Sequence, residues 1–369
     1  MSGSMDDDGH FDPRCDRPRD LVAPLRAGRA GRPGADLTWD RANGPRYERI
    51  GKGLYVPVDR RRSPEQRVLD AAARLPKDGS RGFVTGWGAL RWRQAAYFDG
   101  RPAHGVGEVP VELAIDGRTS MRPWDGVVMS RRLVGMAEHD VLHGVPVATV
   151  QRALFDEIAR RDDLWSAVQA VDMAAAAGLI SVWLFATYVG DCNARTGAPL
   201  ARSACALAVD ESRSPRETWM RLVWVLVASL PDPVVNRPVY DLEGRLLGVP
   251  DLLDTEAGLV GEYSGAVHKG REQHRSDIAR EARFRDHGLE YVEVVAGDTR
   301  EAAAARIRSA WARARAIRAE ARRWTVVAPP SARAVETLDA HLERTGQVER
   351  LTAFRGTPLP GQGSEVARP

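Results

Sequence analysis

The sequence contains few cysteines and no long apolar run. Its three cysteines are scattered and lack the spacing of metal ligands or of a disulfide framework: Cys15, Cys192 and Cys205. No run of about 18 apolar residues is present, and the N-terminus has no signal-peptide pattern, which disfavours a membrane protein and a secreted protein. We therefore expect a cytoplasmic protein without structural disulfides and without a membrane partner.

The chain also lacks a strong charge of one sign. Its 53 basic and 50 acidic residues leave a formal net charge of +3, which excludes a protein that binds nucleic acid through its overall charge. Any contact with nucleic acid must then come from local patches. Lysine is scarce, so the presence of Lys269 close to the acidic residues discussed below is notable.

Several catalytic motifs are absent. We find no Walker loop, no Gly-x-Gly-x-x-Gly after a strand and no zinc-binding Cys/His cluster. His139 and His143 lack the glutamate of a His-Glu-x-x-His zinc site. Ser214, Ser264 and His268 lack the strand-turn-helix context of a hydrolase nucleophile. The sequence therefore supports neither a zinc enzyme nor a Ser-His-acid hydrolase.

Length and composition predict two folded domains with polar ends. The 369 residues exceed one average domain, and a hydrophobic content of 43% supports real cores. Both ends of the chain lack apolar periodicity, which is typical of disorder. The expected division is a disordered arm over 1–36, a mixed α/β domain over 38–201, a second domain over 212–323 and a mostly disordered tail over 331–369. The expected fold class is α+β.

The first domain is expected to begin with a basic β-hairpin at residues 46–58. Ser63 then precedes Pro64 and has the chemistry of a helix N-cap. The rest of this domain combines a β-rich stretch with four helical patterns, at 84–97, 147–159, 164–177 and 182–191.

The second domain is predicted to alternate a helix with strands. Ser214-Pro215-Arg216-Glu217 has the form of a capping box, with serine as N-cap and glutamate three residues later. Strands are expected next, then a polar helix, a last strand and an arginine-rich helix, at 234–240, 246–253, 259–264, 271–287, 289–295 and 298–323. The arginines of this last helix are expected to form a solvated face more readily than a phosphate-binding surface.

Two acidic residues on successive predicted strands carry the central hypothesis. Glu262 lies in the middle of the strand at 259–264, whose alternate residues face opposite sides. Burying a carboxylate there is costly without a partner. Asp251 lies near the end of the preceding strand. Two acids on adjacent strands are suitable partners if they hold a divalent metal between them.

The predicted order of elements resembles a known nuclease core. The α-β-β-β-α-β order, with Glu217 on the first helix and Asp251 and Glu262 on successive strands, is similar to the restriction-endonuclease-like PD-(D/E)XK fold. A more specific likeness covers about residues 212–296 and concerns uncharacterised proteins related to very-short-patch-repair endonucleases. It rests on Gly261-Glu262-Tyr263-Ser264-Gly265, then His268, Asp277, Arg280 and Gly288-Leu289-Glu290-Tyr291-Val292.

A second resemblance concerns the N-terminal part of the chain. The hairpin that ends Gly-Leu-Tyr-Val-Pro-Val at Val58 and the helix at 84–97 resemble a region of abortive-infection (AbiEi-like) antitoxins. No clear recognition helix precedes Arg46. This likeness implies a DNA-binding regulator and a toxin or other regulatory protein as partner.

The nuclease resemblance implies a Mg²⁺ site. Asp251 and Glu262 would be metal ligands, assisted by Glu217 and by a backbone carbonyl next to Glu262. Mg²⁺ prefers hard oxygen ligands, and a metal-bound water is deprotonated more easily and attacks a phosphodiester. His268 or Lys269 would orient that water, act as general base or hold the phosphate. DNA is the expected partner, with contacts from the polar helix through Arg271, Gln273 and Arg280.

One position departs from the family pattern. Ser264 stands where these nucleases usually have aspartate or lysine, and a hydroxyl is a poorer metal ligand than a carboxylate and cannot replace an ammonium group. Either Lys269 substitutes from a nearby turn or the site is inactive. Two functions therefore stay open: a Mg²⁺-dependent endonuclease in DNA repair or defence, and a non-catalytic DNA-binding regulator that keeps the nuclease fold as a scaffold. A protein-interaction role without nucleic acid is a third alternative.

Each site residue also has a purely structural explanation. Glu217 completes a capping box, Asp251 suits a turn after Pro250, and His268 suits a polar turn. Asp277 and Arg280 are three residues apart on one helix, where a surface ion pair or an anchor to the sheet is expected. Geometry separates the functions. Asp251 and Glu262 carboxylates within about 5 Å of each other, in a cleft with arginines on its rim, favour the enzyme. Pairing of Glu262 with Arg280 or another arginine favours the scaffold, and an exposed basic face on the 46–58 hairpin favours the regulator.

Overall fold

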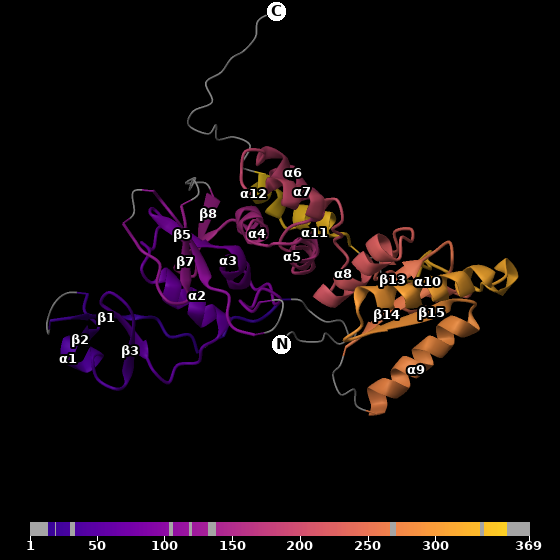
Figure 1. Cartoon of the computed structure of the whole chain (residues 1–369), viewed down its shortest axis with the longest axis horizontal. Helices are drawn as coiled ribbons and strands as arrows, with labels where there is room; N and C mark the ends of the chain where they lie inside the picture. The colour runs from indigo at the N-terminus through magenta and orange to yellow at the C-terminus, as the bar shows by residue number, and fades with distance from the viewer. Residues whose placement is uncertain are drawn as a thin grey trace, which may run out of the picture. The chain divides into compact units, whose positions relative to one another are not determined.

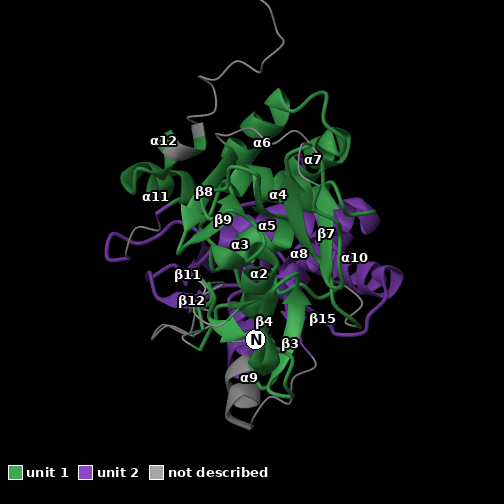
Figure 2. Cartoon of the chain, turned by 90° about the vertical axis from the view of Figure 1, so that its left-hand side faces the viewer, with its two compact units in different colours: residues 1–162, 177–205, 337–369 green, residues 163–176, 206–336 purple. Residues whose placement is uncertain are grey.

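The chain folds into two compact units, each of which combines helices with small sheets. A computed structural model describes residues 14–18, 20–29, 34–102, 106–117, 120–131, 138–265, 271–332 and 336–352, without the side chains of 271–277, 350 and 352. Unit 1 comprises residues 1–162, 177–205 and 337–369, and unit 2 comprises 163–176 and 206–336 (Figure 2). The fold is α+β, as the composition and patterns predict. Within the described ranges, no helix combines the length and apolar character needed to span a membrane.

A five-stranded sheet forms the centre of unit 1. Its strand order is β7-β6-β5-β9-β8, and β5 is antiparallel to β6 and parallel to β9. The strands are β5 (Gly82–Thr85), β6 (Val111–Ile115), β7 (Val127–Ser130), β8 (His139–Leu142) and β9 (Val145–Ala148). The helices of unit 1 include α2 (Pro64–Ala72), α3 (Gly86–Trp92), α4 (Val150–Ile158), α6 (Val182–Asp191) and α7 (Ala198–Cys205). The predicted helices at 147–159 and 182–191 are thus confirmed, and the one predicted at 84–97 is shorter.

A buried ion pair network joins α4 to this sheet. Arg152 is 1% exposed, and its Nε donates to the Asp156 carboxylate at 2.7 Å. Thr85 donates to the same carboxylate at 2.8 Å, and Arg152 also forms an ion pair with Glu138. Buried charges require such pairing, since an unpaired charge in the core is strongly destabilising. The pairing of these residues with one another therefore explains why their charges are buried.

A smaller sheet near the N-terminus contains the predicted basic hairpin. Its strand order is β2-β1-β4-β3, with β3 (Tyr47–Gly51) and β4 (Leu54–Pro57) antiparallel, as expected for residues 46–58. Strand β1 (Leu25–Gly28) pairs with both β4 and β2 (Leu37–Thr38). The helix α1 (Trp39–Ala42) follows β2 directly. The arm expected to be disordered over 1–36 therefore includes a strand. The reason is a small apolar cluster in which Leu25 and Ala27 pack against Leu37 and Tyr55.

The end of the chain, expected to be mostly disordered over 331–369 with one short helix at 334–344, contains two short helices. The helices α11 (Leu338–Arg344) and α12 (Gln347–Thr352) belong to unit 1. Gln151 on α4 donates a hydrogen bond of 3.0 Å to the backbone carbonyl of Leu351. Residues 353–369 of the predicted tail lie outside the described residues.

Helix α5 (Leu164–Ala176) belongs to unit 2, although the sequence places it within the expected domain 38–201. Its buried Asp172 accepts hydrogen bonds from the Thr218 hydroxyl at 2.7 Å and from the Val209 N–H at 2.9 Å. Arg221 completes the set with an ion pair of 2.8 Å. These long-range contacts, rather than position in the sequence, determine where the helix packs.

The core of unit 2 is a four-stranded mixed sheet. Its order is β10-β13-β14-β15, with β14 antiparallel to β13 and parallel to β15. The strands are β10 (Val234–Val235), β13 (Leu252–Asp254), β14 (Leu259–Ser264) and β15 (Glu290–Val295). Along the chain the core order is α8, β10, β13, β14, α9 and β15. A second hairpin of β11 (Val239–Asp241) and β12 (Leu246–Gly248) is inserted between β10 and β13, so the single hairpin predicted at 234–253 is split between two sheets.

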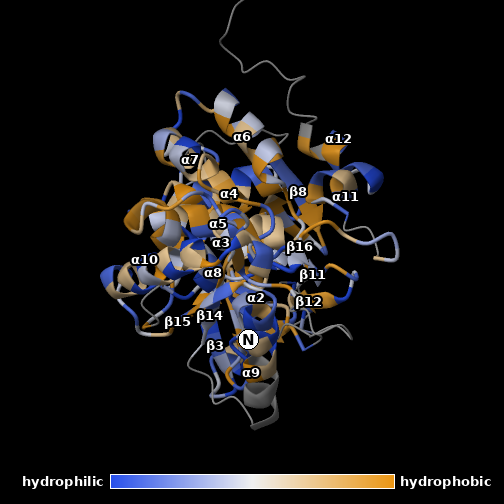
Figure 3. Cartoon of the chain, turned by 90° about the vertical axis from the view of Figure 1, so that its right-hand side faces the viewer, coloured by the Kyte–Doolittle hydropathy of each residue, from blue (hydrophilic) through white to orange (hydrophobic). Residues whose placement is uncertain are grey.

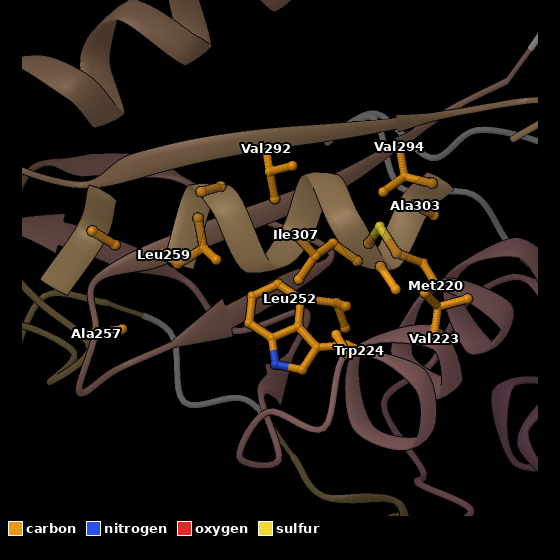
Figure 4. Close-up of a cluster of buried hydrophobic side chains, with 14 of the residues drawn as sticks. Met220, Val223, Trp224, Leu252, Ala257, Leu259, Val292, Val294, Ala303 and Ile307 are labelled. Carbon is orange, nitrogen blue, oxygen red and sulfur yellow. The ribbon is translucent and has the colours of Figure 1, made fainter. Parts of the chain in front are cut away.

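Helices cover both faces of this sheet (Figure 1). On one face, α8 (Pro215–Leu222), its π-helical continuation Val223–Val227 and α10 (Arg300–Ala316) enclose Trp224 and Ile307, which contact Leu252 and Leu259 (Figure 4). Hydrophobic and hydrophilic stretches are mixed along α10 (Figure 3), and the buried residues of that helix are Ala303, Ala304, Ile307, Ala310 and Ala314. The helix predicted at 298–323 ends earlier, at Ala316. Its arginines are exposed.

On the other face lies α9 (Arg271–Asp286), together with a small sheet of β12, β11 and β16 (Trp324–Thr325). Phe284 of α9 is fully buried with Val260 of β14 and Leu253 of β13. Leu259 and Tyr263 instead pack toward Trp224 on the first face. The predicted alternation of β14 is therefore confirmed, and it places Glu262 on the same side as Val260, facing α9.

Candidate functional site

The pairing of β13 with β14 brings Asp251 and Glu262 together. Leu252 is paired with Gly261, so Asp251, one residue before β13, lies opposite Glu262. The backbone N–H of Tyr263 donates a hydrogen bond of 2.8 Å to Asp251 Oδ2. This bond orients the Asp251 carboxylate at the edge of the sheet where β13 begins and β14 ends. The two acids predicted as a pair are therefore neighbours across two strands.

Glu217 lies at the start of α8, where the predicted capping box is present in modified form. The Ser214 hydroxyl accepts a hydrogen bond of 3.2 Å from the Glu217 N–H, as an N-cap does. The Glu217 carboxylate accepts from the N–H of Arg213, one residue before the expected Ser214, at 2.8 Å. The capping explanation of Glu217 therefore holds in substance.

Asn236 links the helix of Glu217 to the strand of Asp251, and the sequence does not single it out. Its side-chain amide donates to Glu217 Oε2 at 2.8 Å, and its backbone N–H donates to the Asp251 carbonyl at 3.1 Å. Its φ of +48° lies in the left-handed region, which asparagine tolerates better than most residues. An asparagine directly after a short strand is the only sequence signal for this role.

The surroundings of Asp251 disfavour the ionised form of its carboxyl group. Burial raises the pKa of Asp251 to about 8, and the charges of Glu217 and then Glu262 add to this rise. The Tyr263 N–H and the Arg280 guanidinium lower the pKa and only partly compensate. The ionised form of Asp251 is thus disfavoured by its surroundings, and a nearby cation would stabilise it.

Arg280 of α9 forms an ion pair with Glu262. The Glu262 residue is 7% exposed, whereas the Arg280 side chain is 33% exposed, so the pair lies at the edge of the core. Burial, followed by the charge of Glu262, also raises the pKa of the neighbouring Tyr291. The ion pair anchors α9 to β14, which is the geometry expected of the scaffold alternative.

The remaining predicted site residues are placed only in part. His268 and Lys269 lie outside the described residues. Arg271 and Gln273 are on α9, but their side chains also lie outside the described part. Ser264 is half-buried at the end of β14, beyond Glu262. The structure therefore brings together Glu217, Asp251, Glu262 and Arg280 from the predicted set.

The donor chemistry suits a hard divalent cation, although not through three carboxylates. Among the residues that the structure describes, no group of three or more His, Cys, Asp or Glu side chains is arranged to hold a metal ion. Glu217 is engaged by Arg213 and Asn236, so it does not complete the expected three-ligand set. Asp251 and Glu262 remain as a pair, and Mg²⁺ commonly uses one or two carboxylates and keeps several waters.

Two other surfaces have a distinctive charge. Arg46, Arg49 and Lys52 are exposed on the β3–β4 hairpin of unit 1. In unit 2, a hollow of about 380 Å³ lies beside β15, does not include the acidic site, and is lined by Glu281, Arg285, Tyr291, Val292, Glu293, Val295, Arg306 and Arg313. All three of its arginines are paired with acids: Arg285 and Arg313 with Glu290, and Arg306 with Asp298. The exposed hairpin is thus the stronger candidate for contact with nucleic acid.

Comparisons with known proteins do not assign the chain to a family, because no family model, no curated protein and no solved structure matches it.

Proposed function

We propose that unit 2 is an endonuclease-like domain with a Mg²⁺-dependent phosphodiesterase site, and that the protein acts on DNA in the cytoplasm, in repair or in defence against foreign DNA. The observation that carries this proposal is the position of Asp251 opposite Glu262 across β13 and β14, where burial and then the charges of Glu217 and Glu262 disfavour the ionised form of Asp251. The order of α8, the three strands, α9 and β15 supports the resemblance to the PD-(D/E)XK core.

The residues of the proposed site would have different roles. Asp251 and Glu262 would hold the cation, with Asp251 kept in position by the Tyr263 N–H. Bound Mg²⁺ supplies Lewis acidity, which lowers the pKa of a coordinated water and neutralises charge on the phosphate. Glu217, held by Asn236, adds negative charge near the site without being a third ligand. Ser264 provides a hydroxyl in place of the usual charged residue, so proton transfer falls to His268 or Lys269.

A specific pair of observations favours a second candidate function, a non-catalytic DNA-binding regulator. Arg280 already neutralises Glu262, as expected of a scaffold that holds no metal. The hairpin of unit 1 exposes Arg46, Arg49 and Lys52, which suits contact with a phosphate backbone. In this function DNA remains a partner, and a toxin or other regulatory protein is the second partner that the antitoxin resemblance implies.

Metal binding and DNA nicking, measured together, separate the two functions. Wild type and Glu262→Gln are titrated with Mn²⁺ or Mg²⁺ in a calorimeter and incubated with supercoiled plasmid. Glu293→Gln is the matched control, because Glu293 is paired with Glu262 in the sheet but is exposed. Saturable metal binding and metal-dependent nicking that disappear in Glu262→Gln and persist in Glu293→Gln support the enzyme. A wild type that binds no metal and leaves DNA intact, yet shifts it in a salt-dependent manner, supports the regulator.

A further inference from the structure

Arg280 places a positive charge among the three acidic side chains. Its guanidinium contacts the Glu262 carboxylate directly, and it also stabilises the ionised form of Asp251 against the effect of the neighbouring acids. A guanidinium that hydrogen-bonds a carboxylate occupies the same oxygen lone pairs that a metal ion uses. Arg280 therefore binds the Glu262 oxygen atoms that a divalent cation would use.

The position of Arg280 is determined by the packing of α9. A Cβ atom at Gly248 of β12 would lie 2.8 Å from Phe284 Cζ and 3.5 Å from Arg280 Cγ and Cδ. Glycine at this position thus allows α9 to approach the sheet, with Phe284 fully buried and the Arg280 stem directly above the strand. The side chain of Arg280 is still 33% exposed, which leaves the guanidinium a path to solvent.

We propose that Arg280 is the resident counter-charge of this acidic site and competes with a divalent cation for Glu262, so that metal binding requires the Arg280–Glu262 pair to open. This inference rests on the proposed metal site. Two positive charges beside one carboxylate repel each other, and this repulsion is strong where water is partly excluded. The ion pair keeps the acids neutralised in the metal-free protein and reduces the affinity for metal. Arg280 is thus a positioning residue that sets metal affinity.

Calorimetric titration of the full chain with Mn²⁺ tests this competition. The variants are Arg280→Gln and, as a control on the same helix, Arg283→Gln, which removes an exposed arginine that donates to the Leu247 carbonyl at 3.2 Å. We expect Arg280→Gln to bind Mn²⁺ about tenfold more tightly than wild type, because one charge-assisted hydrogen bond no longer has to be broken. Arg283→Gln should bind as wild type does.

Thermal unfolding gives a second readout that does not depend on activity. Without metal, Arg280→Gln should unfold at a lower temperature than wild type, and saturating Mn²⁺ should raise its unfolding temperature more than that of wild type. If Arg280→Gln does not fold, Arg280→Lys keeps the charge with fewer hydrogen bonds, and its Mn²⁺ affinity should lie between those of wild type and a neutral variant.

The outcomes distinguish this inference from the proposed function. Equal Mn²⁺ affinities of wild type and the Arg280 variants overturn the competition and leave the metal site standing. Absence of Mn²⁺ binding in every variant overturns the metal site and the competition together. Binding that appears only when Arg280 is replaced supports both.

Discussion

The Asp251 carboxylate accepts a hydrogen bond of 2.8 Å from the backbone N–H of Tyr263, the residue that follows Glu262. This bond holds Asp251 beside Glu262 at the ends of two antiparallel strands, where burial and two acidic neighbours disfavour its charge. The structure thus maintains a carboxylate in a place where ionisation is costly. A bound cation stabilises such an arrangement.

The stability of the metal-free protein should depend on pH through Asp251. Its pKa is raised from 3.8 to about 8, so between these values the folded state binds a proton that the unfolded state has released. The contribution of Asp251 is therefore fully present below pH 4 and is lost as pH rises through 8. Each pH unit in this window changes the free energy of unfolding by up to about 1.4 kcal/mol.

Urea unfolding at pH 5 and pH 8 measures this effect. Asp251→Asn should be less sensitive to pH than wild type by up to about 4 kcal/mol over these three units. Asp232→Asn, an exposed control in the same unit, should retain the wild-type slope. A slope that persists unchanged in Asp251→Asn would contradict the assignment.

The Arg280–Glu262 pair should show a strong energetic coupling. Removing either partner leaves a partly buried charge without its counter-ion, and we expect each single change to glutamine to lower the free energy of unfolding by about 1–3 kcal/mol. The double variant should lose less than the sum, with a coupling on the order of 1 kcal/mol or more.

The exposed pair of Glu281 and Arg285, at 2.9 Å on the same helix, is the control for this cycle. Its coupling should stay below about 0.5 kcal/mol, since solvent screens it. Equal coupling energies for the two pairs would show that the Arg280–Glu262 pair is no stronger than an exposed ion pair.

Asp172 should be essential for the stability of unit 2. Its replacement by alanine leaves Thr218, the Val209 N–H and the Arg221 guanidinium without their shared acceptor. We expect a loss of about 3–5 kcal/mol in the free energy of unfolding, as for a broken buried ion pair. Glu320→Ala, an exposed acid in the same unit, should change it by less than about 0.5 kcal/mol. A near-neutral Asp172→Ala would refute this role.

Gly248 should tolerate no side chain. Gly248→Ala places a Cβ 2.8 Å from Phe284 Cζ, so α9 must shift, and we expect a loss of about 1–3 kcal/mol. Gly190 of α6 is the contrast, because no atom lies within 4 Å of a Cβ built there. Gly190→Ala should be stabilising by up to about 1 kcal/mol, since it reduces the entropy of the unfolded chain. Chemical denaturation of both variants measures the difference.

The hairpin of unit 1 should contribute to DNA binding through its basic side chains. Replacing Arg46, Arg49 and Lys52 by glutamine should weaken binding similarly for all DNA sequences. It should also reduce the slope of log affinity against log salt by about 0.9 for each phosphate that is no longer neutralised. Fluorescence anisotropy at several salt concentrations measures both quantities. A charge-matched control replaces exposed arginines elsewhere: Arg202, Arg315 and Arg318. An equal weakening in the control would point to overall charge instead of the hairpin.

Features encoded in short stretches of sequence were predictable. The alternation of Leu259, Val260 and Glu262 along one strand indicates which side each residue faces, because successive side chains of a strand point in opposite directions. The Ser214-Pro215 start of α8 follows from capping chemistry, which involves only neighbouring residues. The prediction of metal-assisted chemistry at Asp251 and Glu262 stays a prediction.

Other features depend on contacts between distant parts of the chain. Residues 338–352 return to unit 1, where Gln151 bonds Leu351, and α5 packs in unit 2, where Asp172 bonds Thr218. Local patterns do not reveal partners so far apart in the sequence. The same holds for the role of Asn236 between Glu217 and Asp251.

By itself, the sequence determined the α+β class, the basic hairpin and the alternation of the β14 residues between the two faces of the sheet. Only the tertiary structure decided that Asp251 lies opposite Glu262 and that Arg280, eighteen residues after Glu262, neutralises it. The physical reason is that strand register and helix packing depend on the burial of whole surfaces such as those of Phe284 and Trp224. Local propensity and spacing constrain these surfaces without fixing their partners.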